Sequence, residues 1–163
     1  MDGIPGKGKI MLATLIGFLN LLLASLLTGA MFGVFLAFNP RGLDGPHYVQ
    51  LQQQGIRTLH PALPALGAAT IVVTVLAAAM ARQDGVRLSL LAAAAIGFLA
   101  AGLITRFLNQ PINSVVRGWS AATPPAQWMQ LRDKWWRWHV TRLVCGIGGL
   151  CSLILANITA SRL

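Results

Sequence analysis

Four long apolar stretches dominate the pattern of hydrophobic and polar positions along the chain. Each is close to the roughly 20 residues that a helix needs to cross a hydrocarbon core about 30 Å thick. Helices are the expected form, because lipid offers free backbone groups no partners and no alternating strand pattern competes. We therefore predict one all-α domain over residues 1–163, an integral membrane four-helix bundle. Its helices are expected at about 10–38, 61–82, 88–108 and 135–160.

Two polar segments, residues 39–62 and 108–138, interrupt this pattern. Both are longer than the connections that a compact helical bundle usually needs, and connections of that length are often functional. In the first segment, Gln53 or Gln54 falls on the polar face of a short helix that is expected to lie across the mouth of the bundle. We expect both segments to be long interfacial loops beside a functional site.

Composition supports a membrane protein, because 55% of the 163 residues are hydrophobic and only 10% are charged. The formal net charge of +9 is spread over helix ends and loops. That distribution is typical of headgroup contacts and topology signals rather than of a nucleic-acid-binding face. Because cations occur at both ends of the predicted helices, the membrane orientation stays open. We expect a multi-pass protein of the bacterial inner (cytoplasmic) membrane.

Acidic and thiol side chains are too few for several classes of enzyme. The chain has four acidic residues, all of them aspartate, so neither a carboxylate-bridged di-iron site nor the carboxyl pair of a glycosidase is expected. Cys145 and Cys151 lie six residues apart in an apolar stretch and cannot form the adjacent thiols of a quinone-linked thiol oxidoreductase. We expect both to be small packing residues.

The polar run that leads into the last apolar stretch is the part richest in chemistry. At about 3.6 residues per turn, one face of a helix here carries two guanidiniums, an indole and an imidazole. This face comprises Arg132, Trp135 or Trp136, His139 and Arg142. It is too polar for lipid, so we expect it to face a site inside the bundle.

Amide and indole side chains of the second polar segment are further candidates. Asn109 and Asn113 lie four residues apart around Pro111, which should kink or end the third helix. A continuing helical turn would point both amides in one direction. From spacing alone, a helix cap with an interfacial turn explains them as well as a ligand-binding role. Trp119 and Trp128 also fit an aromatic belt at the membrane interface.

A heme or copper site is an alternative, because His47, His60 and His139 are three potential imidazole ligands. Their spacing gives this alternative little support, since only the fold could bring them together. His47 fits an interfacial loop, and His60, followed by Pro61, fits the start of a helix. We therefore expect a site without a metal.

The candidate residues resemble the anthrone oxygenase-like family of small four-helix membrane proteins. The resemblance rests on Asn-x-Pro-Ile-Asn at 109–113, Trp119, Trp128 and Arg132-x-x-Trp135-x-x-x-His139-x-x-Arg142. It covers nearly the whole chain, and the C-terminal motif is its more specific part. It implies a membrane enzyme that oxidises polyketide-derived anthrones to anthraquinones with molecular oxygen, without a dedicated metal or flavin. Family membership supports the fold more directly than this activity.

For such a reaction the resemblance implies a base, an oxyanion site and a dry, flat pocket. His139 is the expected base, and Arg132 and Arg142 would stabilise the enolate oxygen. The expected catalytic residues are His139, Arg132, Arg142 and Asn109. The expected substrate-binding residues are Asn113, Trp119, Trp128, Trp135, Gln53, Gln54 and His60.

A non-catalytic bundle explains almost as much. It would bind a lipid, quinone or pigment, or serve as an accessory subunit of a larger membrane complex, because guanidiniums and indoles at an interface also hold lipid headgroups. A base must face an enclosed pocket, whereas a headgroup site is open, so the position of His139 separates the two classes. Expected partners are membrane lipid and a hydrophobic aromatic small molecule, without nucleic acid. Small residues on the helices also permit a homo-oligomer.

Overall fold

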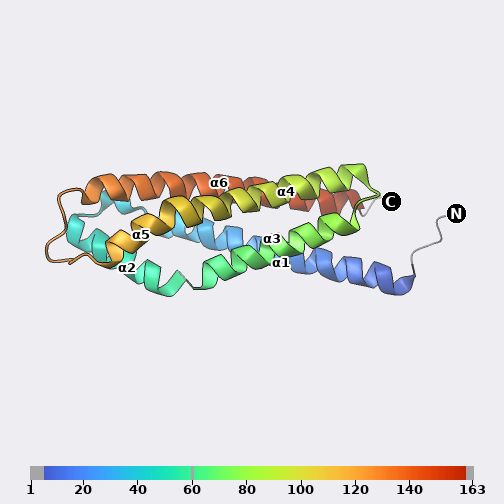
Figure 1. Ribbon diagram of the computed structural model, residues 1–163, viewed down its shortest axis with the longest axis horizontal. Coiled ribbons are helices and arrows are strands. Elements are labelled where there is room, and N and C mark those ends of the chain that lie inside the picture. Colours follow the sequence, from blue (N-terminus) through green and yellow to red (C-terminus); the bar gives the residue numbers. More distant parts are fainter. Residues whose placement is uncertain (1–5, 60, 161–163) are drawn as a thin grey trace.

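The computed structural model describes residues 6–59 and 61–160, which are mostly helical, with a longer loop between Arg117 and Trp128 (Figure 1). The helices are α1 (Lys7–Ala37), α2 (Gly45–Leu59), α3 (Ala62–Met80), α4 (Gly85–Ile104), α5 (Gln110–Arg117) and α6 (Trp128–Ala160). A 3-10 turn, Pro40–Gly42, precedes α2, and a π-helical segment, Thr105–Asn109, links α4 to α5. The described residues contain no strand, which confirms the predicted all-α class.

Four segments are long and apolar enough to cross a membrane, as the hydrophobic pattern predicted. They are Ile10–Gly42, Ala62–Met80, Gly85–Arg117 and Trp128–Thr159. Large apolar side chains such as Leu15, Phe18 and Val144 lie on the outside of the bundle, where hydrocarbon would solvate them. The long helices form an elongated bundle, with α2 and α5 side by side at one end and the start of α1 at the other (Figure 1).

Small residues bring α4 and α6 into backbone contact. A Cβ atom added at Gly97 would lie 2.8 Å from the carbonyl oxygen of Cys145 and 3.0 Å from the Cα atom of Gly149. A Cβ atom added at Gly149 would lie 3.1 Å from the carbonyl oxygen of Ala94. Larger residues at these two glycines would push the helices apart, so small residues are what allows this close packing.

The last helix begins earlier than predicted. Its start was expected near 135, whereas α6 begins at Trp128. Hydropathy marks only the part of a helix that crosses the hydrocarbon. Most residues of the stretch 129–134, such as Leu131, Arg132 and Lys134, are good helix formers that extend α6 into the interface. The predicted loop over 108–138 is therefore wrong in length, because α5 and the first turns of α6 occupy most of it. The segment 39–62 likewise contains α2.

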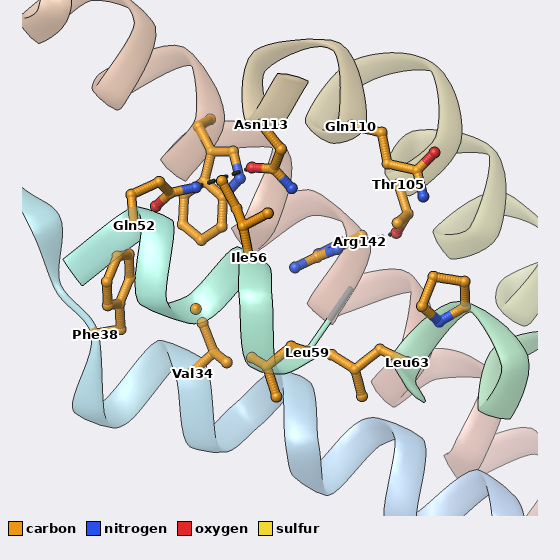
Figure 2. Close-up of a pocket in the computed structure, with 13 residues that line it drawn as sticks. Val34, Phe38, Gln52, Ile56, Leu59, Leu63, Thr105, Gln110, Asn113 and Arg142 are labelled. Carbon is orange, nitrogen blue, oxygen red and sulfur yellow. Dashed lines mark hydrogen bonds between the residues drawn. The ribbon is translucent and has the colours of Figure 1, made fainter. Parts of the chain in front are cut away.

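Pro111 does not end the third membrane segment. The chain passes from α4 through the π-helical segment directly into α5. Pro111 lacks the N–H of a regular helical bond, and its ring crowds the preceding turn. The wider π-helical turn just before it relieves that crowding, and such turns often occur at functional sites. Thr105, Gln110 and Asn113 from this stretch all border the pocket shown in Figure 2.

Candidate functional site

A cavity of about 120 Å³ lies between α1, α2, α3, α5 and α6, near the end of the bundle where α2 lies. Most of its wall is apolar, formed by Val34, Phe38, Gly55, Ile56, Leu59, Leu63, Pro64 and Trp135. The polar side chains that reach it are Gln52, Thr105, Gln110, Asn113 and Arg142 (Figure 2). A mostly apolar cavity with a few convergent polar groups is the usual form of a small-molecule site.

Arg142 is the only charged side chain among the described residues that line this cavity. Its Nη1 donates to the hydroxyl oxygen of Thr105 at 3.1 Å. Its Nε and Nη2 lie 3.2 Å and 2.9 Å from Nδ1 of His139. Both partners are neutral. They hold the guanidinium in place but do not neutralise its positive charge.

The carboxylates of the described residues are engaged elsewhere. Asp44 pairs with His47, and Asp133 pairs with Arg132. Asp84 accepts a hydrogen bond from a backbone N–H at the start of α4. Within the part of the chain that the structure describes, Arg142 therefore has no acidic partner. A partly buried cation in apolar surroundings without a counterion favours the binding of an anionic group.

His139 is fully buried and is not among the residues that line the cavity. Its ring stacks on Trp135 at 5.2 Å with an interplanar angle of 4°, and on Trp136 at 5.6 Å with an angle of 26°. A guanidinium can only donate, so Nδ1 is the acceptor and the hydrogen-bond pattern assigns the proton of the neutral ring to Nε2. In this arrangement His139 orients Arg142 and does not itself face a ligand.

The two asparagines point to different places, so the expectation of a shared direction is wrong. Asn113 lines the cavity, and its Oδ1 accepts a hydrogen bond from Gln52 at 2.9 Å. Asn109 is fully buried, and its Nδ2 donates to the carbonyl oxygen of Trp135 at 3.1 Å. The π-helical segment ends at Asn109, so Asn109 lies in the widened turn, whereas Asn113 lies in the regular helix α5. Asn109 thus ties the third membrane segment to the backbone of α6.

Arg132 holds the connection between α1 and α2 rather than the cavity. Its guanidinium lies 4.9 Å from the ring centroid of Trp128, and its Nε donates to Asp133 at 3.0 Å. Its Nη1 lies 3.4 Å from the carbonyl oxygens of both Arg41 and Leu43. Arg132 does not line the cavity, so its position does not support the predicted contact with an enolate oxygen.

The tryptophans divide between the cavity and the packing around it. Trp135 forms part of the cavity wall. Trp119 packs against the buried cluster that contains Val116, outside the cavity. Trp128 packs on Tyr48, with ring centroids 5.9 Å apart. Of the predicted aromatic wall, the structure therefore brings only Trp135 to the cavity.

Gln53 and Gln54, the predicted residues of the first polar segment that the structure describes, do not line the cavity. The Nε2 atom of Gln53 donates to the carbonyl oxygens of Val116 and Trp119, at 3.0 Å and 2.9 Å, and so caps the end of α5. Gln54 is exposed on the outside of α2. His60 lies outside the described residues. No group of three His, Cys, Asp or Glu side chains that could hold a metal ion occurs within residues 6–59 and 61–160.

Gln52, Thr105 and Gln110 line the cavity but were not predicted as site residues. The signal for Gln52 is present in the sequence, because it lies four residues after Tyr48 and four before Ile56, both buried. A glutamine on the apolar face of an amphipathic helix is a candidate for a polar site. Thr105 and Gln110 have no comparable signal, since the π-helical segment that sets their register is not visible in the sequence.

The fold and the site define a helical membrane protein with a mostly apolar cavity that one cation, Arg142, lines. A family model described as anthrone oxygenase matches residues 54–152. The match covers more than half of the chain, which therefore belongs to the anthrone oxygenase family, as the resemblance in its motifs implied. The cavity residues from α5 and α6 lie in the matched region, whereas those from α1 precede it. No curated protein and no solved structure matches the chain.

Proposed function

We propose that the chain is a membrane oxygenase that converts an anthrone-like tricyclic ketone into the corresponding quinone with molecular oxygen. Membership of the anthrone oxygenase family supports an oxygenase-type reaction. The observation that carries the proposal is Arg142, a cation on the wall of a largely apolar cavity whose hydrogen-bond partners are both neutral. Such a site suits a flat apolar molecule that carries one oxygen able to become anionic.

The substrate binds in this proposal as its enolate. The methylene group of an anthrone lies between two aromatic rings and opposite the ketone, so its loss of a proton gives a delocalised, phenolate-like anion. The guanidinium of Arg142 stabilises the anionic oxygen, while Trp135 and Phe38 contact the rings. The substrate enters as the neutral ketone, and the unbalanced charge of Arg142 favours its ionisation once the ketone oxygen lies at the guanidinium. The methylene proton passes to water in the cavity.

Oxygen then reacts with the bound enolate. One electron passes from the enolate to O₂, and the carbon radical and superoxide combine into a peroxide at the former methylene carbon. After the peroxide takes up a proton, the remaining C–H proton is lost, the O–O bond breaks, and hydroxide leaves as water. One ketone and one O₂ give one quinone and one water. Oxidation of the methylene to a carbonyl supplies all four electrons that O₂ accepts, so the proposed reaction balances without an external reductant, metal or flavin.

His139 acts in this proposal as a positioning residue for Arg142. Its Nδ1 accepts from the guanidinium, and the stacked indoles of Trp135 and Trp136 fix the plane of the ring. The competing assignment keeps His139 as the base, as the family motif implied. That assignment requires the guanidinium to leave Nδ1 when substrate binds, so that Nδ1 can take the methylene proton.

Oxygen consumption by the purified protein with anthrone tests the proposal, with correction for oxidation of anthrone without protein. The variant is Arg142→Gln, and Arg137→Gln, exposed on the same helix, is its matched control. We expect one O₂ to be consumed for each quinone formed. The rate should be about 100-fold lower in Arg142→Gln and unchanged in Arg137→Gln. Binding of anthrone without oxygen uptake would contradict the oxygenase and favour the non-catalytic binding bundle.

A further inference from the structure

A second cavity, of about 250 Å³, adjoins the first and is larger. It extends between α1, α3 and α4, and its wall is mostly apolar. The polar residues that line it are Thr105, Gln110, Arg142 and the exposed Arg106. The residues that line both cavities are Leu63, Pro64, Thr105, Gln110 and Arg142. The guanidinium of Arg142 therefore lies where the two cavities meet, and the proposed ring-binding site uses only the smaller cavity.

Small residues form the side of the second cavity that faces outward between α3 and α4. They are Gly67 and Ala68 on α3 and Gly102 on α4, and both Ala68 and Gly102 are exposed. Both helices are membrane-spanning segments. In a bilayer this opening therefore faces acyl chains rather than water.

The glycines at this opening differ from those that pack the bundle. A Cβ atom added at Gly67 would come no closer than 3.9 Å to Leu27, and one added at Gly102 no closer than 3.7 Å to Ile71. These are ordinary van der Waals distances, in contrast to the overlap found at Gly97 between α4 and α6. Helix packing therefore does not require glycine at 67 or 102. Their lack of side chains keeps space open instead.

We propose that the Arg142 site takes an amphiphile that enters from the bilayer between α3 and α4, with its acidic oxygen at Arg142 and an apolar chain in the second cavity. The inference rests on the proposed function for the ring system and adds that the natural substrate carries an alkyl or polyketide-derived chain. Burial of that chain contributes affinity in proportion to the apolar area it removes from solvent. A substrate that partitions into lipid reaches the cation without crossing the polar end of the bundle.

Binding of alkyl carboxylates to the full-length protein in detergent tests this inference without turnover. The probes are butanoate, dodecanoate and uncharged dodecanol. The variants Gly102→Leu and Ala68→Leu fill the opening, and Ala92→Leu, exposed on α4 away from both cavities, is the control. Partitioning of a probe into detergent is the same for every variant, so it cancels when dissociation constants are compared.

We expect the Kd of dodecanoate to rise at least about tenfold in both filled variants, since each loses the burial of two or more methylenes. The Kd of butanoate should stay within about twofold of the wild-type value, and Ala92→Leu should bind both probes normally. Arg142→Gln should remove the preference for dodecanoate over dodecanol.

Equal binding of dodecanoate to wild type and both filled variants would overturn the proposed binding of the chain in the second cavity. Equal binding of dodecanoate and dodecanol by the wild type would overturn the acidic-oxygen contact. The two proposals can fail independently. If only the proposed oxygenase activity is wrong, oxygen uptake with anthrone is absent while the dependence of binding on the alkyl chain of the probe persists.

Discussion

Arg142 and His139 lie one turn apart on α6, with the guanidinium Nη2 2.9 Å from the imidazole Nδ1. The imidazole is buried and its ring contacts two indoles, whereas the guanidinium reaches the cavity wall. This pairing fixes the orientation of a cation without neutralising its charge. The charge remains for a ligand, and the central role that we propose for Arg142 follows from this relationship.

Replacement of Arg142 by lysine should not preserve activity. The guanidinium contacts His139 and Thr105 with different nitrogens, and a single ammonium cannot reproduce that geometry while it also binds a substrate oxygen. We expect kcat/KM for anthrone oxidation to fall by about tenfold or more. Arg137→Lys is the control. A fully active Arg142→Lys would show that charge alone, and not orientation, is required.

The two roles of His139 can be separated with asparagine. The Oδ1 atom of an asparagine lies close to the place of Nδ1, so His139→Asn can still accept from Arg142, but it cannot act as a base near neutral pH. We expect His139→Asn to keep much more of the rate than His139→Ala, measured as oxygen uptake across pH 6–9 relative to wild type. Equal loss in both variants, together with a missing pH-dependent step, would support His139 as the base instead.

His139→Ala should also lower stability more than His139→Asn, because it leaves a larger void beside the rings of Trp135 and Trp136. We expect the variant to lose about 2–4 kcal/mol of unfolding free energy, as is typical of truncated buried side chains. Thermal denaturation in detergent measures this loss. A melting temperature equal to that of wild type would mean that the stacked ring contributes little to the fold.

The hydrogen bond between Gln52 and Asn113 joins α2 to α5 beside the cavity. A double-mutant cycle with Gln52→Leu and Asn113→Leu should give a coupling free energy of about 1 kcal/mol. The KM for anthrone should rise in each single variant, because each leaves a polar group of the cavity without its partner. Gln54→Leu, exposed on the same helix, should change neither quantity. Additive effects in the cycle would contradict a role of this bond in closing the cavity.

Arg132→Ala should lower stability with little change in turnover. Its guanidinium contacts Trp128 and the carbonyl oxygens of the connection between α1 and α2, outside the cavity. We expect a loss of about 1–2 kcal/mol in unfolding free energy and a kcat within about twofold of wild type. A large fall in kcat in a variant of normal stability would restore Arg132 to the catalytic residues.

Tyr48, the only tyrosine of the chain, is fully buried, and burial raises the pKa of its phenol well above the ordinary value of about 10. The fold therefore favours the neutral phenol. The raised pKa of Tyr48 therefore contributes to the free energy of unfolding. This contribution is complete below the pKa that the phenol has in the unfolded chain, and it is lost as the pH rises through the pKa of the phenol in the folded protein. We expect the melting temperature to fall above about pH 10 in wild type and less in Tyr48→Phe. Phenolate absorbance should appear only as the protein unfolds; phenolate in the native protein at pH 10 would contradict the buried environment.

The sequence was sufficient to predict the four membrane helices, because long apolar runs have few alternatives in lipid. It could not show where α6 begins, because hydropathy does not identify helical residues at the membrane–water interface. The orientation of α2 could have been predicted from the spacing of Tyr48 and Ile56. These two residues mark its apolar face, and Gln52 lies on that same face.

The candidate site was predicted less completely than the fold. The helical spacing of the last motif placed Trp135, His139 and Arg142 on one side of α6, and the structure confirms that they contact one another in sequence along that side. Which of them faces the cavity depends on the packing of α2 and α5 against α6. Pro111 predicts a local distortion of the third helix, but the sequence does not specify that this distortion is a π-helical turn or how α2 and α5 pack.

Anaerobic mixing of the purified protein with anthrone, followed by admission of oxygen, tests the central role of Arg142 most directly. The proposed function predicts that wild type forms the enolate absorption band near neutral pH without oxygen, and that the band converts to quinone with one O₂ consumed per quinone. Arg142→Gln should form neither band above the level seen without protein. An enolate band of equal size in Arg142→Gln, or quinone formation by wild type no faster than without protein, would contradict it.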